Sequence, residues 1–316
     1  MSPRQGLRHL ISIHDLTTAE VAGLFRLAAD VKADRAKYEN ALRRKTLGMI
    51  FQKSSTRTRV SFEAGMAQLG GHALFLSSRD IQLGRGETIS DTAQVLSRYI
   101  DGVMARTFAH QDVLDLAAYG TVPVINGLTD DLHPCQALTD YFTLSEVFGG
   151  LPALASRKIA YVGDGNNMAH SLMLGAPKVG MDFAIACPEG YEPDERYLEL
   201  ARADAAAAGT SIEVIRSPSQ AAEGASAVYT DVWASMGQEA ERETRLRAFE
   251  GYQVDASVMA AARPEAVFLH CLPCHRGEEV AAEVADGPQS RIFDEAENRL
   301  HTQKAVLLWL MAGIEI

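Results

Sequence analysis

Residues 47–69 read LGMIFQKSSTRTRVSFEAGMAQL and join an apolar run to a second apolar pattern through a polar turn. The run Leu47–Phe51 predicts a buried strand, and the spacing in Val60–Leu69 predicts a helix that Gly70 and Gly71 end. A strand that leads through a short polar turn into a helix is the unit from which parallel sheets are built. This stretch therefore indicates an α/β fold.

The same alternation continues on both sides of this stretch. The first helix is predicted by the capping box of Thr17 and Glu20. Further strands are expected at 73–76, 103–105, 122–125, 159–162, 183–186, 212–215, 228–229 and 267–270. Further helices are expected at 88–99, 136–148, 171–179 and 196–208, and over the last twenty residues. We predict two doubly wound parallel-sheet domains joined by helices, 1–149 and 150–316, with the C-terminal helix returning to the first.

Composition and charge exclude several classes of protein. With 316 residues, 47% of them apolar and 22% charged, the chain is neither disordered nor fibrous. Its 30 Lys and Arg against 41 Asp and Glu give a net charge of −11, so we expect neither nucleic acid nor a membrane as partner. Any anion must then bind at a local basic cluster. We find no export signal or membrane-length apolar run, and expect a cytoplasmic protein with four reduced cysteines.

The polar turn has the composition of such an anion site. A strand-to-helix turn presents backbone N–H groups and the positive end of the helix dipole. Ser55, Thr56 and Thr58 add hydroxyl donors, while Arg57 and Arg59 add guanidinium groups that can hold an oxyanion through two hydrogen bonds. A solvated basic turn is the alternative, but the position between a strand and a helix favours a phosphate site.

Several separated motifs resemble the aspartate and ornithine carbamoyltransferase family. Residues 55–59, STRTR, are similar to its carbamoyl-phosphate signature, and residues 133–140, HPCQALTD, to its second signature. Arg106 matches an arginine that polarises the carbonyl oxygen, and Gln82 a residue offered to a neighbouring subunit's site. The resemblance implies that carbamoyl phosphate is bound by Ser55, Thr56, Arg57, Thr58, Gln82, Arg106, His133, Gln136 and Arg299.

Other motifs resemble the ornithine-using branch of this family. Residues 231–239, DVWASMGQE, are similar to its amino-acid-binding loop, and residues 270–273, HCLP, to a second contact segment. The resemblance implies that the amino acid is bound by Asn167, Asp231, Ser235, Met236, Cys271 and Leu272, with Asn166 as the close alternative to Asn167. It also implies catalytic roles for Arg106, His133, Asp231 and Cys271.

Two segments allow other interpretations. Cys271 and Cys274, followed by His275, match the haem-attachment pattern C-x-x-C-H, and the two cysteines alone suit a redox pair or half a zinc site. Cys274 also departs from the family, which more often has a small residue without a thiol there. Gly163–Asn167 follows a strand like a dinucleotide fingerprint, but Met168 replaces the third glycine.

The resemblance implies transfer of a carbamoyl group from carbamoyl phosphate to the side-chain amine of L-ornithine, giving L-citrulline, with synthesis of arginine the preferred direction. It calls for no metal or organic cofactor. It implies a homotrimer, or a multiple of trimers, in which Gln82 reaches a neighbouring subunit. The alternatives are a carbamoyltransferase for another amine, such as putrescine or an acylated ornithine, a binding protein without turnover, and a nicotinamide-dependent oxidoreductase.

Overall fold

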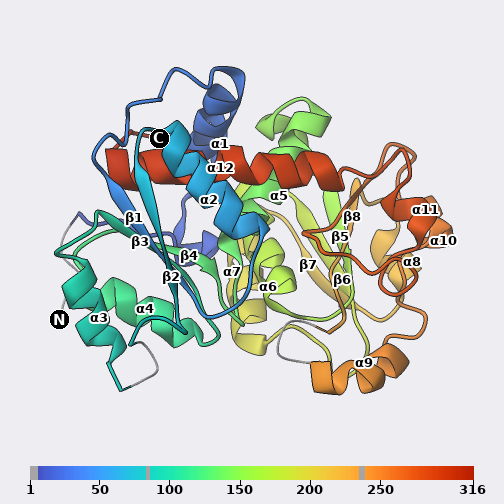
Figure 1. The fold of residues 1–316 in the computed structure, drawn as a ribbon. Helices are drawn as coiled ribbons and strands as arrows, with labels where there is room; N and C mark the ends of the chain where they lie inside the picture. The colour runs from blue at the N-terminus through green and yellow to red at the C-terminus, as the bar shows by residue number, and fades with distance from the viewer. Residues whose placement is uncertain (1–5, 83–85, 235–238) are drawn as a thin grey trace. The chain divides into compact units, whose positions relative to one another are not determined.

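The structure, a computed structural model, describes residues 6–82, 86–234 and 239–316. The chain forms two compact units, Met1–Leu138 with Asn298–Ile316, and Thr139–Glu297. It passes from one unit to the other within helix α5 (Pro134–Phe148) and within helix α12 (Ile292–Ala312) (Figure 1). The sequence placed the domain division at 149/150, whereas the compact units divide at 138/139.

A parallel sheet of order β2-β1-β3-β4 forms the centre of the first unit. Its strands are β1 (Thr46–Phe51), β2 (His72–Ser77), β3 (Gly102–Arg106) and β4 (Val124–Leu128). Leu10 pairs with Ile125 and so extends the sheet beyond β4. The helices are α1 (Thr18–Ala33), α2 (Arg57–Gln68), α3 (Ile89–Leu96) and α4 (His110–Tyr119), and α3 and α4 lie side by side (Figure 1).

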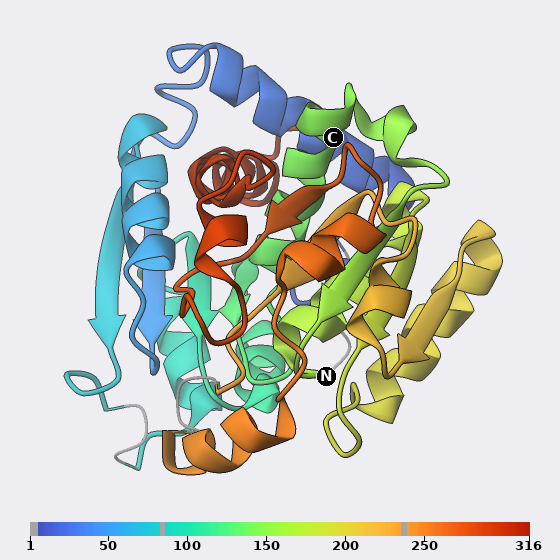
Figure 2. The ribbon, with the colours of Figure 1, turned by 90° about the vertical axis from the view of Figure 1, so that its right-hand side faces the viewer.

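A second parallel sheet, of order β7-β6-β5-β8-β9, forms the centre of the other unit (Figure 2). Its strands are β5 (Lys158–Val162), β6 (Asp182–Ala186), β7 (Ile212–Ile215), β8 (Ala227–Thr230) and β9 (Val267–Leu269). Its helices are α6 (Asn167–Gly175), α7 (Glu195–Ala208), α8 (Pro218–Ala222), α9 (Arg242–Ala248), α10 (Ala256–Ala261) and α11 (Ala282–Ala285). Short 3-10 helices are η1 (Ile13–Asp15), η2 (Leu151–Leu154), η3 (Pro177–Val179) and η4 (Glu239–Glu241).

The structure confirms the predicted α/β class and parallel sheets, and it corrects some element boundaries. The capping box of Thr17 and Glu20 forms as predicted at the start of α1. Helix α2 begins at Arg57 rather than Val60, so the arginines of the polar turn lie in its first turn. Helix α4 was not predicted, because its N-cap, Ala109, has no side chain that could cap the helix. None of the helices described is long and apolar enough to cross a membrane.

Both sheets contain the point at which a doubly wound fold binds ligands. In the first sheet the strand order reverses between β1 and β3, and in the second between β5 and β8. Loops leaving two such strands diverge to opposite faces of the sheet and leave a crevice beyond the carboxyl ends of the strands. Ligand-binding residues are therefore expected in the segments that follow β1 and β3, and in those that follow β5 and β8.

Candidate functional site

Four cationic side chains gather in the first unit, around the reversal point of its sheet. Lys53 follows β1, Arg57 lies in the first turn of α2, Arg106 ends β3 and Arg299 lies in α12. Lys53, Arg106 and Arg299 are almost fully buried. A concentration of positive side chains at the carboxyl edge of a parallel sheet, in a chain that is acidic overall, is typical of a site for a negatively charged ligand.

His133 lies close enough to all four cations to be affected by their positive charge. Its side chain is buried, and burial together with the positive charges of Arg299, Arg106, Arg57 and Lys53 lowers its pKa well below the ordinary value. The imidazole is therefore neutral at physiological pH. A neutral imidazole can donate one N–H to a carbonyl oxygen without giving up its proton.

Arg299 forms hydrogen bonds with two other predicted site residues, each from a distant segment of the chain. Its Nη1 donates to Oε1 of Gln136 at 2.5 Å, and its Nη2 donates to Oγ1 of Thr58 at 3.1 Å. All three side chains are buried. The guanidinium thus fixes the orientation of Gln136 and ties α12 to the first turn of α2.

The other residues of the polar turn have separate roles. The Ser55 hydroxyl accepts the backbone N–H of Thr58 at 3.2 Å, whereas Thr56 is exposed. Arg59 is turned to the surface of α2, where it donates to Glu63 at 2.9 Å and lies 3.7 Å from the centre of the Phe75 ring. Of the two arginines of the motif, Arg57 is the one whose charge is a main cause of the lowered pKa of His133.

Gln82 is exposed and lies in the segment that follows β2. The residues directly after it are outside the described part of the chain. Its expected contact with carbamoyl phosphate therefore stays a prediction.

Lys53 is a site residue that the sequence motifs did not supply. Its ammonium group pairs with Asp130 and lies 4.7 Å from the centre of the Phe108 ring. The side chain of Asp130 is more than half exposed, so the pair is open to solvent on one side only. The available signal was a lysine two residues before the STRTR motif, but nothing in the sequence distinguished it from a surface lysine.

Asp231 is the centre of a hydrogen-bond network in the second unit, just beyond β8. Its Oδ1 accepts the backbone N–H of Val232 at 2.8 Å and the thiol of Cys271 at 3.2 Å. Its Oδ2 accepts Nδ2 of Asn166 at 3.0 Å. The carboxylate is thus buried and held by three donors from the segments that follow β5, β8 and β9.

Asn166 also connects this network to the start of α6. Its Oδ1 accepts the backbone N–H groups of Met168 and Ala169 and the hydroxyl of Tyr161. We predicted Asn167 as the asparagine of the site, with Asn166 as the close alternative. Asn167 is half-buried as the first residue of the helix, while Asn166 is the residue that contacts Asp231.

The thiol of Cys271 is protonated in this environment. Burial and the neighbouring Asp231 raise its pKa well above the ordinary value for cysteine. A protonated thiol donates a hydrogen bond and cannot accept a proton from a substrate amine. Cys271 can therefore orient Asp231 and contact a substrate, but it is not a base.

Two buried acids hold the segment that contains Cys271. Glu295 accepts the backbone N–H of His270 at 3.0 Å, and Oε1 of Glu279 lies 3.2 Å from Nε2 of His270. Nδ1 of the same imidazole accepts the N–H of Leu272 at 2.9 Å, which assigns the proton to Nε2. Leu272 has a φ of 58°, a conformation that costs free energy and is maintained by such contacts.

Gly165 gives a physical reason against the dinucleotide interpretation. A Cβ built at this glycine would lie 2.2 Å from the backbone nitrogen of Pro193 and 2.3 Å from the carbonyl carbon of Glu192. The chain between β6 and α7 thus fills the space in which a pyrophosphate would approach a dinucleotide-binding turn. The glycine permits this close packing of backbone segments.

The paired cysteines also lack the features of a redox or metal pair. All four cysteines are free, and burial raises the pKa of Cys274 despite the nearby Arg276. Cys274 packs against the core of the second unit. Ligand atoms of Asp231, His270 and Cys271 lie within 4.8 Å of one another, but hydrogen bonds already occupy both ring nitrogens of His270.

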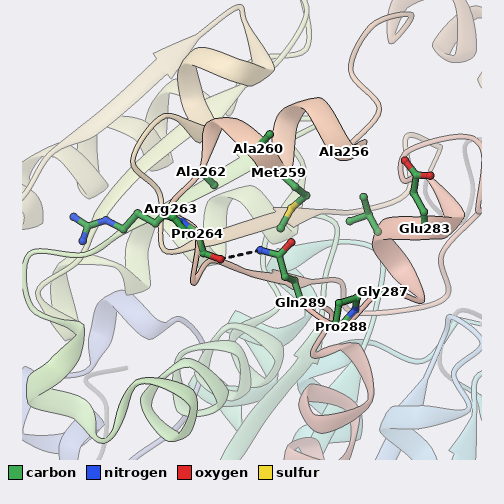
Figure 3. A pocket seen from close by; sticks show the side chains of 11 residues that line it. Ala256, Met259, Ala260, Ala262, Arg263, Pro264, Glu283, Gly287, Pro288 and Gln289 are labelled. Carbon is green, nitrogen blue, oxygen red and sulfur yellow. Dashed lines mark hydrogen bonds between the residues drawn. The ribbon is translucent and has the colours of Figure 1, made fainter.

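Ser235 and Met236, the two remaining predicted residues, lie outside the described residues, as does Gly237. A pocket of about 350 Å³ near α10 and α11 is lined mainly by small and apolar residues (Figure 3). The guanidinium of Arg263 extends away from the other residues in this view. No predicted site residue among those described lines this pocket, so it is separate from the two clusters.

Comparison with known proteins agrees with this arrangement. Residues 8–146 match the family model described as "Aspartate/ornithine carbamoyltransferase, carbamoyl-P binding domain". Residues 155–310 match "Aspartate/ornithine carbamoyltransferase, Asp/Orn binding domain".

Similar proteins match along almost their whole length. Ornithine carbamoyltransferase from Symbiobacterium thermophilum is 58% identical, over 96% of this chain and 98% of the relative. The crystal structure of ornithine carbamoyltransferase from Pyrococcus furiosus is 54% identical with a TM-score of 0.92, over 98% of each chain. Ornithine transcarbamoylase from Giardia lamblia is 36% identical with a TM-score of 0.90, over 98% of this chain and 100% of that one. This chain belongs to the aspartate/ornithine carbamoyltransferase family.

Proposed function

We propose that this protein transfers the carbamoyl group of carbamoyl phosphate to the side-chain amine of L-ornithine, giving L-citrulline and phosphate. The observation that carries the proposal is the convergence of four cations on the neutral His133. Such a cluster suits a small dianion with a carbonyl group. A relative from P. furiosus is named "Ornithine carbamoyltransferase, anabolic", which supports arginine synthesis as the role.

In the first unit, Arg57, Arg106 and Lys53 bind the phosphate of carbamoyl phosphate, with Ser55, Thr56 and Thr58 as further donors. Arg106 and His133 donate to the carbonyl oxygen, on which negative charge develops during attack. Gln136, oriented by Arg299, positions the carbamoyl NH2. Donors already held in place need no reorganisation when the charge forms, which is why they lower the barrier.

In the second unit, Asp231 attracts the side-chain amine of ornithine. A free alkyl amine has a pKa of about 10.4, so roughly one molecule in a thousand is neutral at pH 7. Asn167, Ser235, Met236 and Leu272 contact the rest of the amino acid. The three donors on Asp231 limit how strongly this carboxylate holds an ammonium group, and thereby favour release of the proton before attack.

The proton of the attacking amine leaves with the departing phosphate. Cys271 cannot take it, because its thiol stays protonated. His133 is also a poor acceptor, since burial and four cations hold its pKa far below neutral. Cleavage of the carbamoyl phosphate dianion leaves phosphate as a strongly basic trianion, which takes up the proton of the amine and departs as HPO4²⁻.

The protein works in the cytoplasm as a homotrimer, or a multiple of trimers, in which Gln82 reaches a neighbouring subunit's site. Free thiols at all four cysteines suit a reducing compartment. Large exposed apolar side chains concentrate in the first unit, which supports contacts there between copies of the chain. They are Val60, Leu74, Phe75, Val95, Tyr99, Phe108, Leu114 and Tyr119.

A buried ion pair fixes the segment after Asp231. Nη1 of Arg245, in α9, donates to Oδ2 of Asp164 at 2.7 Å and to the carbonyl oxygen of Trp233 at 3.0 Å. Burial raises the pKa of Asp164 to about 6, although Arg245 opposes the shift. Protonation of Asp164 below this pH removes the buried one of the two carboxylate charges that hold Arg245, the other being the exposed Glu241, and so loosens the anchor of Trp233.

The reaction itself is tested by citrulline formation from carbamoyl phosphate with L-ornithine, aspartate, putrescine and N-acetylornithine in parallel. We expect turnover with L-ornithine alone. Turnover with a different amine would agree with the assigned carbamoyl-phosphate site but would refute L-ornithine as the amine substrate. If no amine is turned over although carbamoyl phosphate binds, the alternative function, a binding protein without turnover, would be favoured.

Replacing Arg57 tests the phosphate site. Arg57→Ala should lower kcat/KM by about 10²- to 10³-fold, the usual effect of losing a donor to developing negative charge. Arg59→Ala is the matched control, because that arginine lies on the same helical turn but contacts Glu63 and Phe75. It should stay within about threefold of the parent. Equal losses in the two variants would contradict the assignment.

The Asp164–Arg245 pair predicts a pH effect. As pH falls through about 6, the KM for ornithine should rise in the parent relative to Asp164→Asn, because only the parent loses an ion pair on protonation. The ratio of the two KM values cancels the ionisation of the amine itself, which is common to both. A ratio that is constant from pH 5 to pH 8 would refute this coupling.

Light scattering after size-exclusion chromatography tests the assembly. Leu74→Glu should shift a trimer towards the monomer, because it places a charge in the apolar surface of β2. Leu200→Glu, at a position with the same 39% exposure in the second unit, is the control and should remain trimeric. A monomeric parent, or dissociation of both variants alike, would overturn the proposed interface.

A further inference from the structure

One cluster of potential metal ligands lies outside the two substrate clusters. It consists of His275, Glu278 and Glu279, in the tight loop that follows β9. One ligand atom from each residue lies within 4.8 Å of the others. Nδ1 of His275 is 3.7 Å from Oε2 of Glu279 and 4.0 Å from Oε2 of Glu278.

Glu279 provides a second, independent observation that points to a cation in this loop. Its side chain is 1% exposed, and its Oε2 has no hydrogen-bond partner among the described residues. That oxygen is the one directed at Nδ1 of His275, at a distance too long for a hydrogen bond. A buried carboxylate oxygen without a partner is costly, so a cation at this point would remove a real penalty.

The other oxygen of Glu279 is already fixed. Oε1 accepts the backbone N–H of His275 and lies 3.2 Å from Nε2 of His270. Such contacts behind a ligating carboxylate hold it in one orientation and are typical of protein metal sites. The carboxylate therefore presents Oε2 in a fixed direction.

The charge and access of the cluster also suit a dication. Arg242 pairs with Oε1 of Glu278, which leaves one net negative charge on the two glutamates and that arginine. The side chain of His275 is 51% exposed, so an ion can enter from solvent. Bonds of about 2.1 Å in a tetrahedral zinc site place two ligand atoms about 3.4 Å apart, close to the spacing seen here.

We propose that His275, Glu278 and Glu279 form a binding site for a divalent cation of the zinc class, with water completing the coordination. One imidazole nitrogen and two carboxylate oxygens favour Zn²⁺ over Mg²⁺, which prefers oxygen ligands in octahedral geometry.

Calorimetric titration of the EDTA-treated protein with zinc chloride tests the site. The parent for this experiment carries Cys271→Ser and Cys274→Ser, so that thiolate binding near Asp231 does not contribute. We expect one Zn²⁺ per chain, and at least about tenfold weaker binding in His275→Gln and in Glu278→Gln. His72→Gln, which removes an exposed histidine of β2, is the control and should bind like its parent.

Arg242→Gln should have the opposite effect and strengthen binding about two- to fivefold, since it removes a competing cation from Glu278. Cobalt(II) bound to the unmodified chain at this site should give a spectrum without thiolate charge-transfer absorption. The proposal is overturned if the parent binds no zinc, or if His275→Gln binds it as tightly as the control. It is also overturned if the cobalt spectrum shows that the ion binds only through thiolate.

Discussion

The concentration of positive charge at the carboxyl edge of the first sheet is the constraint on which the rest of this unit depends. Three of its four cations are almost fully buried, and the aspartate that pairs with Lys53 is more than half exposed. Such a cluster persists only where backbone geometry enforces it. The parallel strands do so, because β1 and β3 end at the same edge and direct Lys53 and Arg106 to the same place.

A consequence of this positive field is the protonation state of His133. In water a histidine titrates near pH 6.5, and this one would be partly charged at neutral pH. Burial and four nearby cations keep it neutral instead. The positive charges therefore keep His133 neutral and able to donate a hydrogen bond, so the loss of one cation would also change the environment of this histidine.

The parallel sheets, and three of the four cations that lie near His133, could be predicted from the sequence for a clear physical reason. Strand–helix alternation is a local pattern, and motif residues such as Arg57 and His133 are recognised by their neighbours along the chain. Lys53 and the Asp231–Asn166 hydrogen bond depend on contacts between distant segments, which no local pattern contains. Helix α4 was missed because its start has no capping side chain, so tertiary packing rather than local signals establishes it.

The second unit shows how the same acidic side chain serves two purposes, according to how its oxygens are satisfied. Asp231 receives donors on both oxygens, so its position is fixed while its charge is moderated. Glu279 receives donors on Oε1 only, and its Oε2 is buried without one among the described residues. The first arrangement suits a carboxylate that must bind a substrate cation and release it. The second suits a carboxylate that completes its coordination with a retained ion, because only a permanent partner offsets the cost of burying that oxygen.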